Sequence, residues 1–101
     1  MGDNTLTDPL GRKITLLDRA WYAHIVKGHP EISEHRALVE AAVTSPREIR
    51  ISRSDPDCRL YFGHGPREGV IMMVVADLPL GIVKTAHLCK RVSGGRQEWS
   101  K

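Results

Sequence analysis

The apolar residues of the first half of the chain recur with helical spacing. Leu17, Trp21 and Ile25 stand four residues apart, which predicts a helix with one buried stripe. Gly28 suits the left-handed position after a helix, and Pro30 cannot donate a backbone hydrogen bond. We therefore expect this helix to end before Pro30.

A second apolar stripe follows directly. Its members are Ile32, His35, Val39, Ala42 and Val43. Ser33 is a plausible residue to cap the start of this helix, as Asp18 is for the first helix. The pair Ser45-Pro46 is typical of a helix end. Two adjacent short helices are expected, joined by a tight corner at His29.

Beyond residue 46 the period changes from helical spacing to two. Strict alternation predicts half-buried strands over 48–52 and 58–63. The continuous apolar run over 70–76 predicts a central strand, and a fourth strand is expected over 82–88. A short strand is also expected over 13–17, and a hairpin loop over 64–69.

These elements predict an α+β fold, with two N-terminal helices packed on one face of a four-stranded antiparallel sheet. If Cys58, Leu60 and Phe62 face the core, then Arg59 and Tyr61 face outward together. We expect one domain over residues 1–101, with a loose lead-in over 1–12 and a polar basic tail over 91–101.

Composition narrows the class of protein. No apolar run approaches the ~18 residues of a membrane span, and the N-terminus lacks the layout of a signal peptide. We therefore expect a cytoplasmic protein without a membrane partner. Cys58 and Cys89 are too few for a disulfide framework and are expected to be reduced.

Positive charge is concentrated near the C-terminus. From Lys84 onward there are five basic residues, and Glu98 is the single acidic one. Such an excess favours a polyanion such as RNA as partner, although a solvated basic tail has the same composition. Lys90 and Arg91 are the RNA-binding candidates in this segment.

Two of the five histidines lie near the end of the first predicted helix. His24 is expected at the edge of the buried stripe, where it either meets a ligand or only hydrogen-bonds to a nearby carbonyl. His29 is expected in the turn. Histidines five residues apart do not share a helical face, and no Cys-x-x-Cys or His-Glu-x-x-His motif is present, so we predict neither a metal site nor another cofactor.

Five short motifs, in this order, together resemble the barnase-EndoU-colicin-RelE superfamily, and more closely its phage-associated branch of nuclease-like domains, PBECR. They are His24-Ile25, His29-Pro30-Glu31, Thr44-Ser45-Pro46-Arg47-Glu48-Ile49, Arg59-Leu60-Tyr61-Phe62 and Gly81-Ile82-Val83-Lys84-Thr85-Ala86-His87. The resemblance covers about residues 14–90. It implies metal-independent RNA cleavage on the open face of the sheet, by attack of a 2′-hydroxyl on the adjacent phosphorus.

Carried over by motif, the resemblance implies catalytic roles for His24, Lys84 and Thr85. His87 stands where a tyrosine is more usual, so the identity of the second acid–base group stays open. Neighbours such as Lys84 and Thr85 share a sheet face only beside a bulge or a strand end.

Arg59, Tyr61 and His29 are the RNA-binding candidates, in addition to those near the C-terminus. Each is also an ordinary strand or turn residue. The leading interpretation is a cytoplasmic ribonuclease, with a toxin restrained by an inhibitor or antitoxin protein as one form of it. A non-catalytic RNA- or protein-binding module on the same fold is the alternative.

Overall fold

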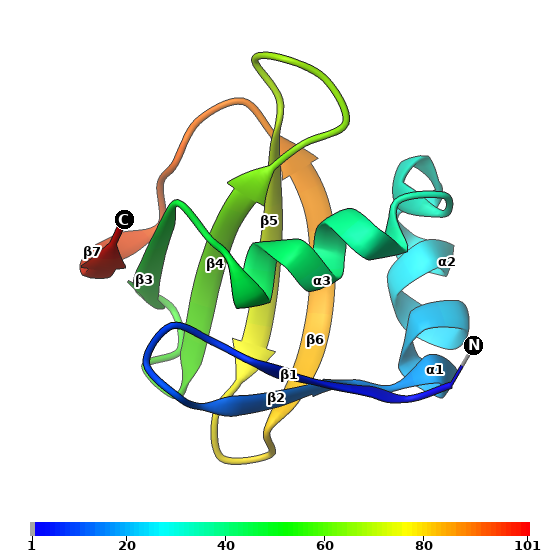
Figure 1. Ribbon diagram of the computed structural model, residues 1–101, viewed down its shortest axis with the longest axis horizontal. Coiled ribbons are helices and arrows are strands. Elements are labelled where there is room, and N and C mark those ends of the chain that lie inside the picture. Colours follow the sequence, from blue (N-terminus) through cyan, green and yellow to red (C-terminus); the bar gives the residue numbers. More distant parts are fainter. Residues whose placement is uncertain (1) are drawn as a thin grey trace.

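The computed structural model describes residues 2–101, which form one curled sheet with helices on one side (Figure 1). Its seven strands are β1 (Asn4–Thr7), β2 (Lys13–Leu16), β3 (Glu48–Ser52), β4 (Cys58–His64), β5 (Ile71–Asp77), β6 (Ile82–Cys89) and β7 (Gly95–Ser100). Their order in the sheet is β1-β2-β6-β5-β4-β3-β7. Neighbouring strands run antiparallel except β2 and β6, which pair in parallel at Thr15 and Ile82.

The helices are short and lie between β2 and β3 in the chain. They are α1 (Asp18–Ala20), a π-helical turn (Trp21–Ile25), α2 (Val26–Gly28), a 3-10 turn (Pro30–Ile32) and α3 (Arg36–Thr44). None of the helices within residues 2–101 is long and apolar enough to cross a membrane.

Trp21 and Ile25 are fully buried, as their spacing predicts. The prediction that Ser33 caps the second helix is wrong, because the 3-10 turn after Pro30 delays the start of α3 and leaves His35 at the cap position.

The main core lies between α3, the β1–β2 hairpin and one face of the sheet. Its buried members include Leu16, Trp21, Ile25, Val39, Val43, Ile49, Tyr61, Met72, Val74, Val83 and Ala86. α3 crosses this face in front of the central strands (Figure 1). At the crossing, a Cβ on Gly63 would lie 2.7 Å from the Cα of Ala42, so the helix and β4 meet with no side chain between them.

The predicted fold, two helices on a four-stranded antiparallel sheet, is wrong. The sheet has seven strands because β1 forms within the expected lead-in, β7 forms within the expected tail, and β2 joins the four expected strands. It is mixed because β2 pairs in parallel with β6. Both are edge strands, and their sequences, NTLT and GRQEWS, carry no alternation of apolar residues, since only Leu6 and Trp99 pack on the core. Hydrophobic pattern therefore does not reveal them. Residue 1 of the lead-in lies outside the described residues.

Arg59 and Tyr61 point to the helix side of the sheet, so the prediction that they face outward together is wrong. Tyr61 is 0% exposed, and its hydroxyl donates a hydrogen bond of 2.6 Å to Asp8. Arg59 donates through Nε to Glu98 at 2.9 Å. Both faces of β4 are covered, so alternation along this strand cannot tell which face meets the helices.

An arginine–carboxylate cluster made of Asp8, Arg12, Arg59, Tyr61 and Glu98 holds the curled sheet together. Arg12, in the β1–β2 turn, donates through Nε to Asp8 at 2.8 Å. The same guanidinium donates to the two carboxylate oxygens of Glu98, on β7, at 2.7 and 3.1 Å. The first hairpin is thereby joined to the strand at the opposite end of the sheet.

Candidate functional site

The outer face of the sheet, opposite α3, carries the polar residues of the candidate site. A smaller apolar cluster lies on this face, built on Leu60, Phe62 and Ile71 and flanked by Met73, Val75, Cys89 and Val92. Val92 belongs to the connection that leads from β6 to β7. No helix among residues 2–101 packs on this cluster, which leaves the face accessible along β6.

A β-bulge in β6 brings Lys84 and Thr85 to the outer face together. Val75 pairs with Thr85 and Ala76 with Val83, so Lys84 is the extra residue. The Lys84 ammonium lies 4.0 Å from the Cys58 sulfur, which belongs to the outer face of β4. These two candidates therefore do share a face, as their common role requires.

His29 and His87 form a pair at the edge of β6. His29 follows α2 as its C-terminal cap residue, and His87 lies on β6, opposite Met73 of the outer face. The two ring centroids are 5.3 Å apart, with the rings tilted by 34°. Glu31 approaches the same pair, with a carboxylate oxygen 3.5 Å from Nδ1 of His29. The corner Gly28-His29-Pro30 thus places a turn histidine against a strand histidine.

The pKa of His87 is lowered from its ordinary value of 6.5. Burial is the largest cause, because it penalises the charged imidazolium, and the charge of His29 acts in the same direction. Glu31 opposes both effects without cancelling them. His87 is therefore neutral at pH 7 and able to accept a proton.

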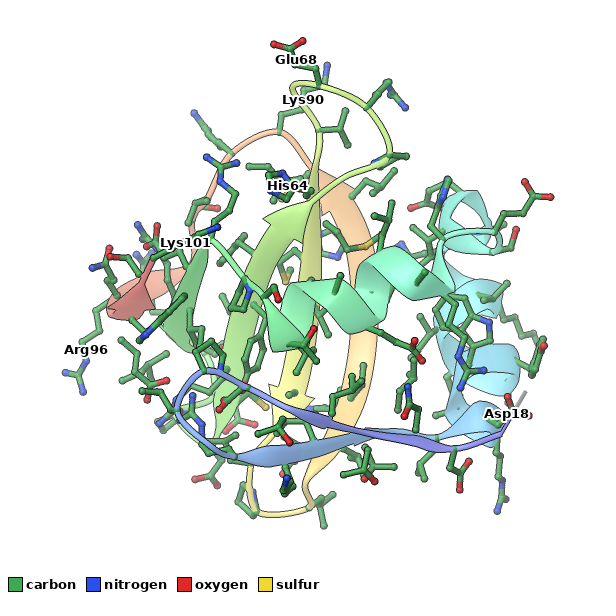
Figure 2. All side chains as sticks on the ribbon, viewed as in Figure 1. Asp18, His64, Glu68, Lys90, Arg96 and Lys101 are labelled. Atoms are coloured by element: carbon green, nitrogen blue, oxygen red, sulfur yellow. The ribbon has the colours of Figure 1, made fainter. Side chains whose placement is uncertain are left out.

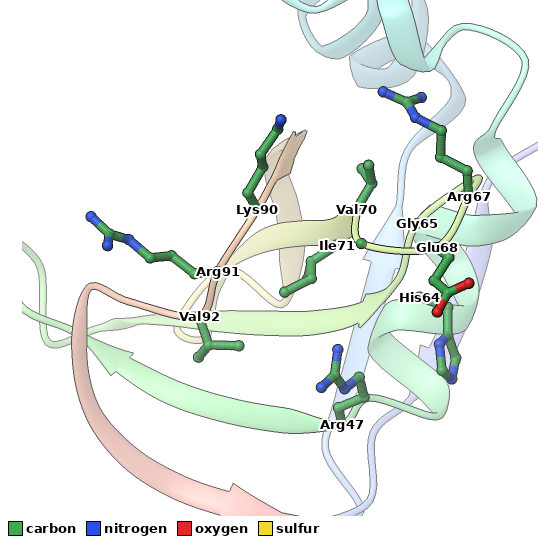
Figure 3. Close-up of a pocket in the computed structure, with 11 residues that line it drawn as sticks. Arg47, His64, Gly65, Arg67, Glu68, Val70, Ile71, Lys90, Arg91 and Val92 are labelled. Carbon is green, nitrogen blue, oxygen red and sulfur yellow. The ribbon is translucent and has the colours of Figure 1, made fainter.

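A basic pocket of about 740 Å³ lies at one end of the sheet (Figure 3). It is lined by Arg47, His64, Gly65, Arg67, Glu68, Gly69, Val70, Ile71, Lys90, Arg91 and Val92. Lys90 and Arg91 form one wall, and the loop after β4 forms the other (Figure 3). Figure 2 shows Lys90, His64 and Glu68 together at this end, away from Arg96 on β7.

His24 is exposed, and no hydrogen bond or ion pair joins its side chain to another residue of the described chain. The prediction that it lies at the edge of the buried stripe is wrong. The helix buries only the narrow Trp21 and Ile25 stripe, and Tyr22 and Ala23 are exposed as well. The structure brings His29, rather than His24, to His87.

Arg47, His64 and Arg67 were not among the sequence candidates. Their grouping could have been predicted from the sequence. In an antiparallel meander, the loop after one strand lies at the same end of the sheet as the last residues of the strand two further along the chain. The predicted loop over 64–69 and the end of the strand over 82–88 are such a pair. Their basic residues should have been grouped.

Neither cysteine is a nucleophile candidate. Burial is the largest cause that raises the pKa of both the Cys58 and the Cys89 thiol, so both stay protonated near neutral pH. In residues 2–101, no three His, Cys, Asp or Glu side chains gather in a way that could hold a metal ion.

The arginine–carboxylate cluster is fully hydrogen-bonded and faces the core, so its arrangement serves the fold.

Comparison of the chain with protein-family models, with curated proteins and with solved structures found no match.

Proposed function

We propose that this protein is a ribonuclease that cleaves RNA through attack of a 2′-hydroxyl on the adjacent phosphorus, with His29 and His87 as its acid–base pair. The observation that carries the proposal is the contact of the two imidazoles, 5.3 Å between centroids, on the face that also presents Lys84 and Thr85. Paired imidazoles supply the two proton transfers that this reaction needs.

His87 acts as the base, because its lowered pKa keeps it neutral at pH 7. It takes the proton of the 2′-hydroxyl while that oxygen bonds to phosphorus. The bond from phosphorus to the 5′ oxygen breaks, and His29 donates a proton to the leaving oxygen. The products are a 2′,3′-cyclic phosphate and a 5′-hydroxyl, and proton exchange with water resets the pair.

Lys84 and Thr85 stabilise the negative charge that develops on the phosphoryl oxygens. Thr85 stands two residues from His87 on the same strand, about 7 Å away, with its side chain on the same face. The Thr85 hydroxyl donates a hydrogen bond to a phosphoryl oxygen, and the Lys84 ammonium supplies a positive charge. Both interactions are strongest in the transition state, when the oxygens carry the most negative charge.

The test is single-turnover cleavage of a labelled RNA by variants of the pair. His87→Ala and His29→Ala should each lower the rate by about 10²- to 10⁴-fold, the usual worth of a general acid or base. His35→Ala is the matched control, since His35 is also half-buried and its side chain makes no capping hydrogen bond to α3. It should cleave at the parent rate.

Melting temperatures of all variants establish that each is folded. If folded His87→Ala and His29→Ala cut RNA as fast as the parent, the pair is not catalytic and the proposal is wrong. A parent protein that binds RNA without cutting it would equally contradict the proposal and would favour the RNA-binding module.

A further inference from the structure

We infer that the basic pocket binds the sugar–phosphate backbone of the RNA strand next to the cleaved bond, without reading its sequence. The RNA in this inference rests on the proposed function. The pocket itself is a separate feature, because neither His29 nor His87 is among its lining residues.

The first argument is uncompensated charge. Four permanent cations line the pocket, namely Arg47, Arg67, Lys90 and Arg91, and Glu68 is the one carboxylate among its lining residues. None of the four is in an ion pair with another described residue. By contrast, other arginines of the chain are paired, among them Arg12, Arg36, Arg50 and Arg59. Four cations around one pocket, beside a single carboxylate, attract an anion.

The second argument is position. Ile71 lines the pocket and pairs with Cys89, two residues beyond His87 on the outer face. Lys90 follows His87 by three residues, which at the rise of a strand is roughly 10 Å. A strand of RNA held at the histidine pair would therefore reach the pocket with its next phosphates.

The third argument concerns what the pocket lacks. His64 is the one aromatic ring among its lining residues, and no Phe, Tyr or Trp joins it, whereas proteins that hold the bases of single strands stack successive bases on several such rings. Its apolar part is limited to Val70, Ile71 and Val92. Guanidinium and ammonium groups suit phosphate oxygens, so the contacts are to the backbone and are independent of sequence.

The loop that forms one wall has a fixed shape. A Cβ on Gly65 would lie 2.3 Å from the carbonyl oxygen of Val70, so only glycine fits there. The amide of Gly65 donates to that same carbonyl at 3.0 Å. Arg67 is thereby held at the rim by a closed loop, which reduces the entropy lost on binding.

The test separates binding from cleavage. The double variant K90Q/R91Q is compared with R19Q/R96Q, which removes the same charge from exposed positions outside the pocket. Binding is measured by fluorescence anisotropy with 2′-O-methyl oligouridylate and oligoadenylate, in which the blocked 2′ oxygen cannot attack. Each titration is repeated over a range of salt concentrations.

K90Q/R91Q should bind both oligonucleotides at least about tenfold more weakly, and the slope of log affinity against log salt should fall by about 0.7 for each lost contact. R19Q/R96Q should match the parent. With RNA, K90Q/R91Q should need a higher protein concentration than the parent to reach half of its maximal single-turnover rate, because binding of the strand is weakened.

Equal affinity of K90Q/R91Q and the parent would overturn the inference, even if the protein cleaves RNA. A loss of affinity for one oligonucleotide alone would overturn the sequence-independent part. If K90Q/R91Q instead lost binding to polyglutamate while RNA binding stayed unchanged, the pocket would belong to an acidic protein and the inference would be wrong. If the pocket passes these tests in a protein that cuts no RNA, its role in binding the RNA backbone stands, while the proposed function and the place of the pocket next to a cleaved bond are both refuted.

Discussion

Asp8 is the more deeply buried of the two buried charged residues within 2–101. Its side chain is 0% exposed, and it accepts hydrogen bonds from Tyr61, from the guanidinium of Arg12 and from the backbone amides of Leu10 and Arg12. Burial alone would raise the pKa of Asp8, but these donors outweigh burial and lower it below the usual 3.8. Tyr61, which the sequence pattern makes an RNA-binding candidate, thus donates its hydroxyl hydrogen bond to a buried carboxylate.

Asp8 should make stability depend on acid. Folding lowers the pKa of Asp8, so as the pH falls below about 4 the unfolded chain takes up the proton before the folded chain does. The stability that the ionised Asp8 contributes is therefore complete above that pH. It is lost as the pH falls through the pKa of the folded state. Asp8→Asn should lower the free energy of unfolding at pH 7 by roughly 1.5–3 kcal/mol and remove its share of the acid dependence.

Urea unfolding at pH 7 and below pH 4 measures this effect. Asp57→Asn is the control, since Asp57 is exposed and its side chain has no hydrogen-bond partner among the described residues. Equal stability of Asp8→Asn and the parent at pH 7 would show that the arginine–carboxylate cluster does not stabilise the fold.

At the scale of elements, the position of α3 over the sheet depends on Gly63. This glycine is the next-to-last residue of β4, an interior strand, where glycine weakens a sheet unless a neighbour approaches closely. The neighbour here is Ala42, so two small residues let α3 lie directly on β4. The same helix covers the inner face of the sheet, so the outer face is the one that stays accessible.

Gly63→Ala should destabilise the protein by about 1–3 kcal/mol, because its Cβ would overlap the backbone of Ala42 and force α3 away. Gly28→Ala is the matched control: a Cβ there meets nothing within 4 Å, and alanine is the better helix former. Thermal unfolding of both variants measures the difference. A Gly63→Ala protein as stable as the parent would mean that α3 is not in close contact with β4.

At the scale of the whole molecule, sequence reasoning recovers the interior and misses the edges. The strands at Lys13–Leu16, Glu48–Ser52, Cys58–His64, Ile71–Asp77 and Ile82–Cys89 lie where the apolar pattern predicts them. β1 and β7 were missed because each contributes a single apolar side chain to the core, Leu6 and Trp99, and because the Arg12–Glu98 ion pair joins residues 86 positions apart. No local pattern carries a contact of that range.

The candidate site was predicted in the same uneven way. His87 and Thr85 share a face by simple alternation, and Lys84 joins them only because of a bulge whose position the alternation does not show. His29 contacts His87 because of the corner at Gly28-His29-Pro30. The sequence predicts the position of this corner in the chain, but not the direction in which the His29 ring points. Arg59 and Tyr61 were assigned to the wrong face because both sides of β4 are apolar enough to be buried.

The most direct test of the proposed function is to identify the ends that the parent protein leaves on RNA. A labelled oligoribonucleotide and the DNA of the same sequence are incubated with the protein in excess EDTA, and the products are analysed by mass spectrometry. The proposal predicts RNA fragments ending in a 2′,3′-cyclic phosphate and a 5′-hydroxyl, with the DNA intact, since only RNA carries the attacking 2′-hydroxyl. Intact RNA, or fragments ending in a 3′-hydroxyl and a 5′-phosphate, would contradict it.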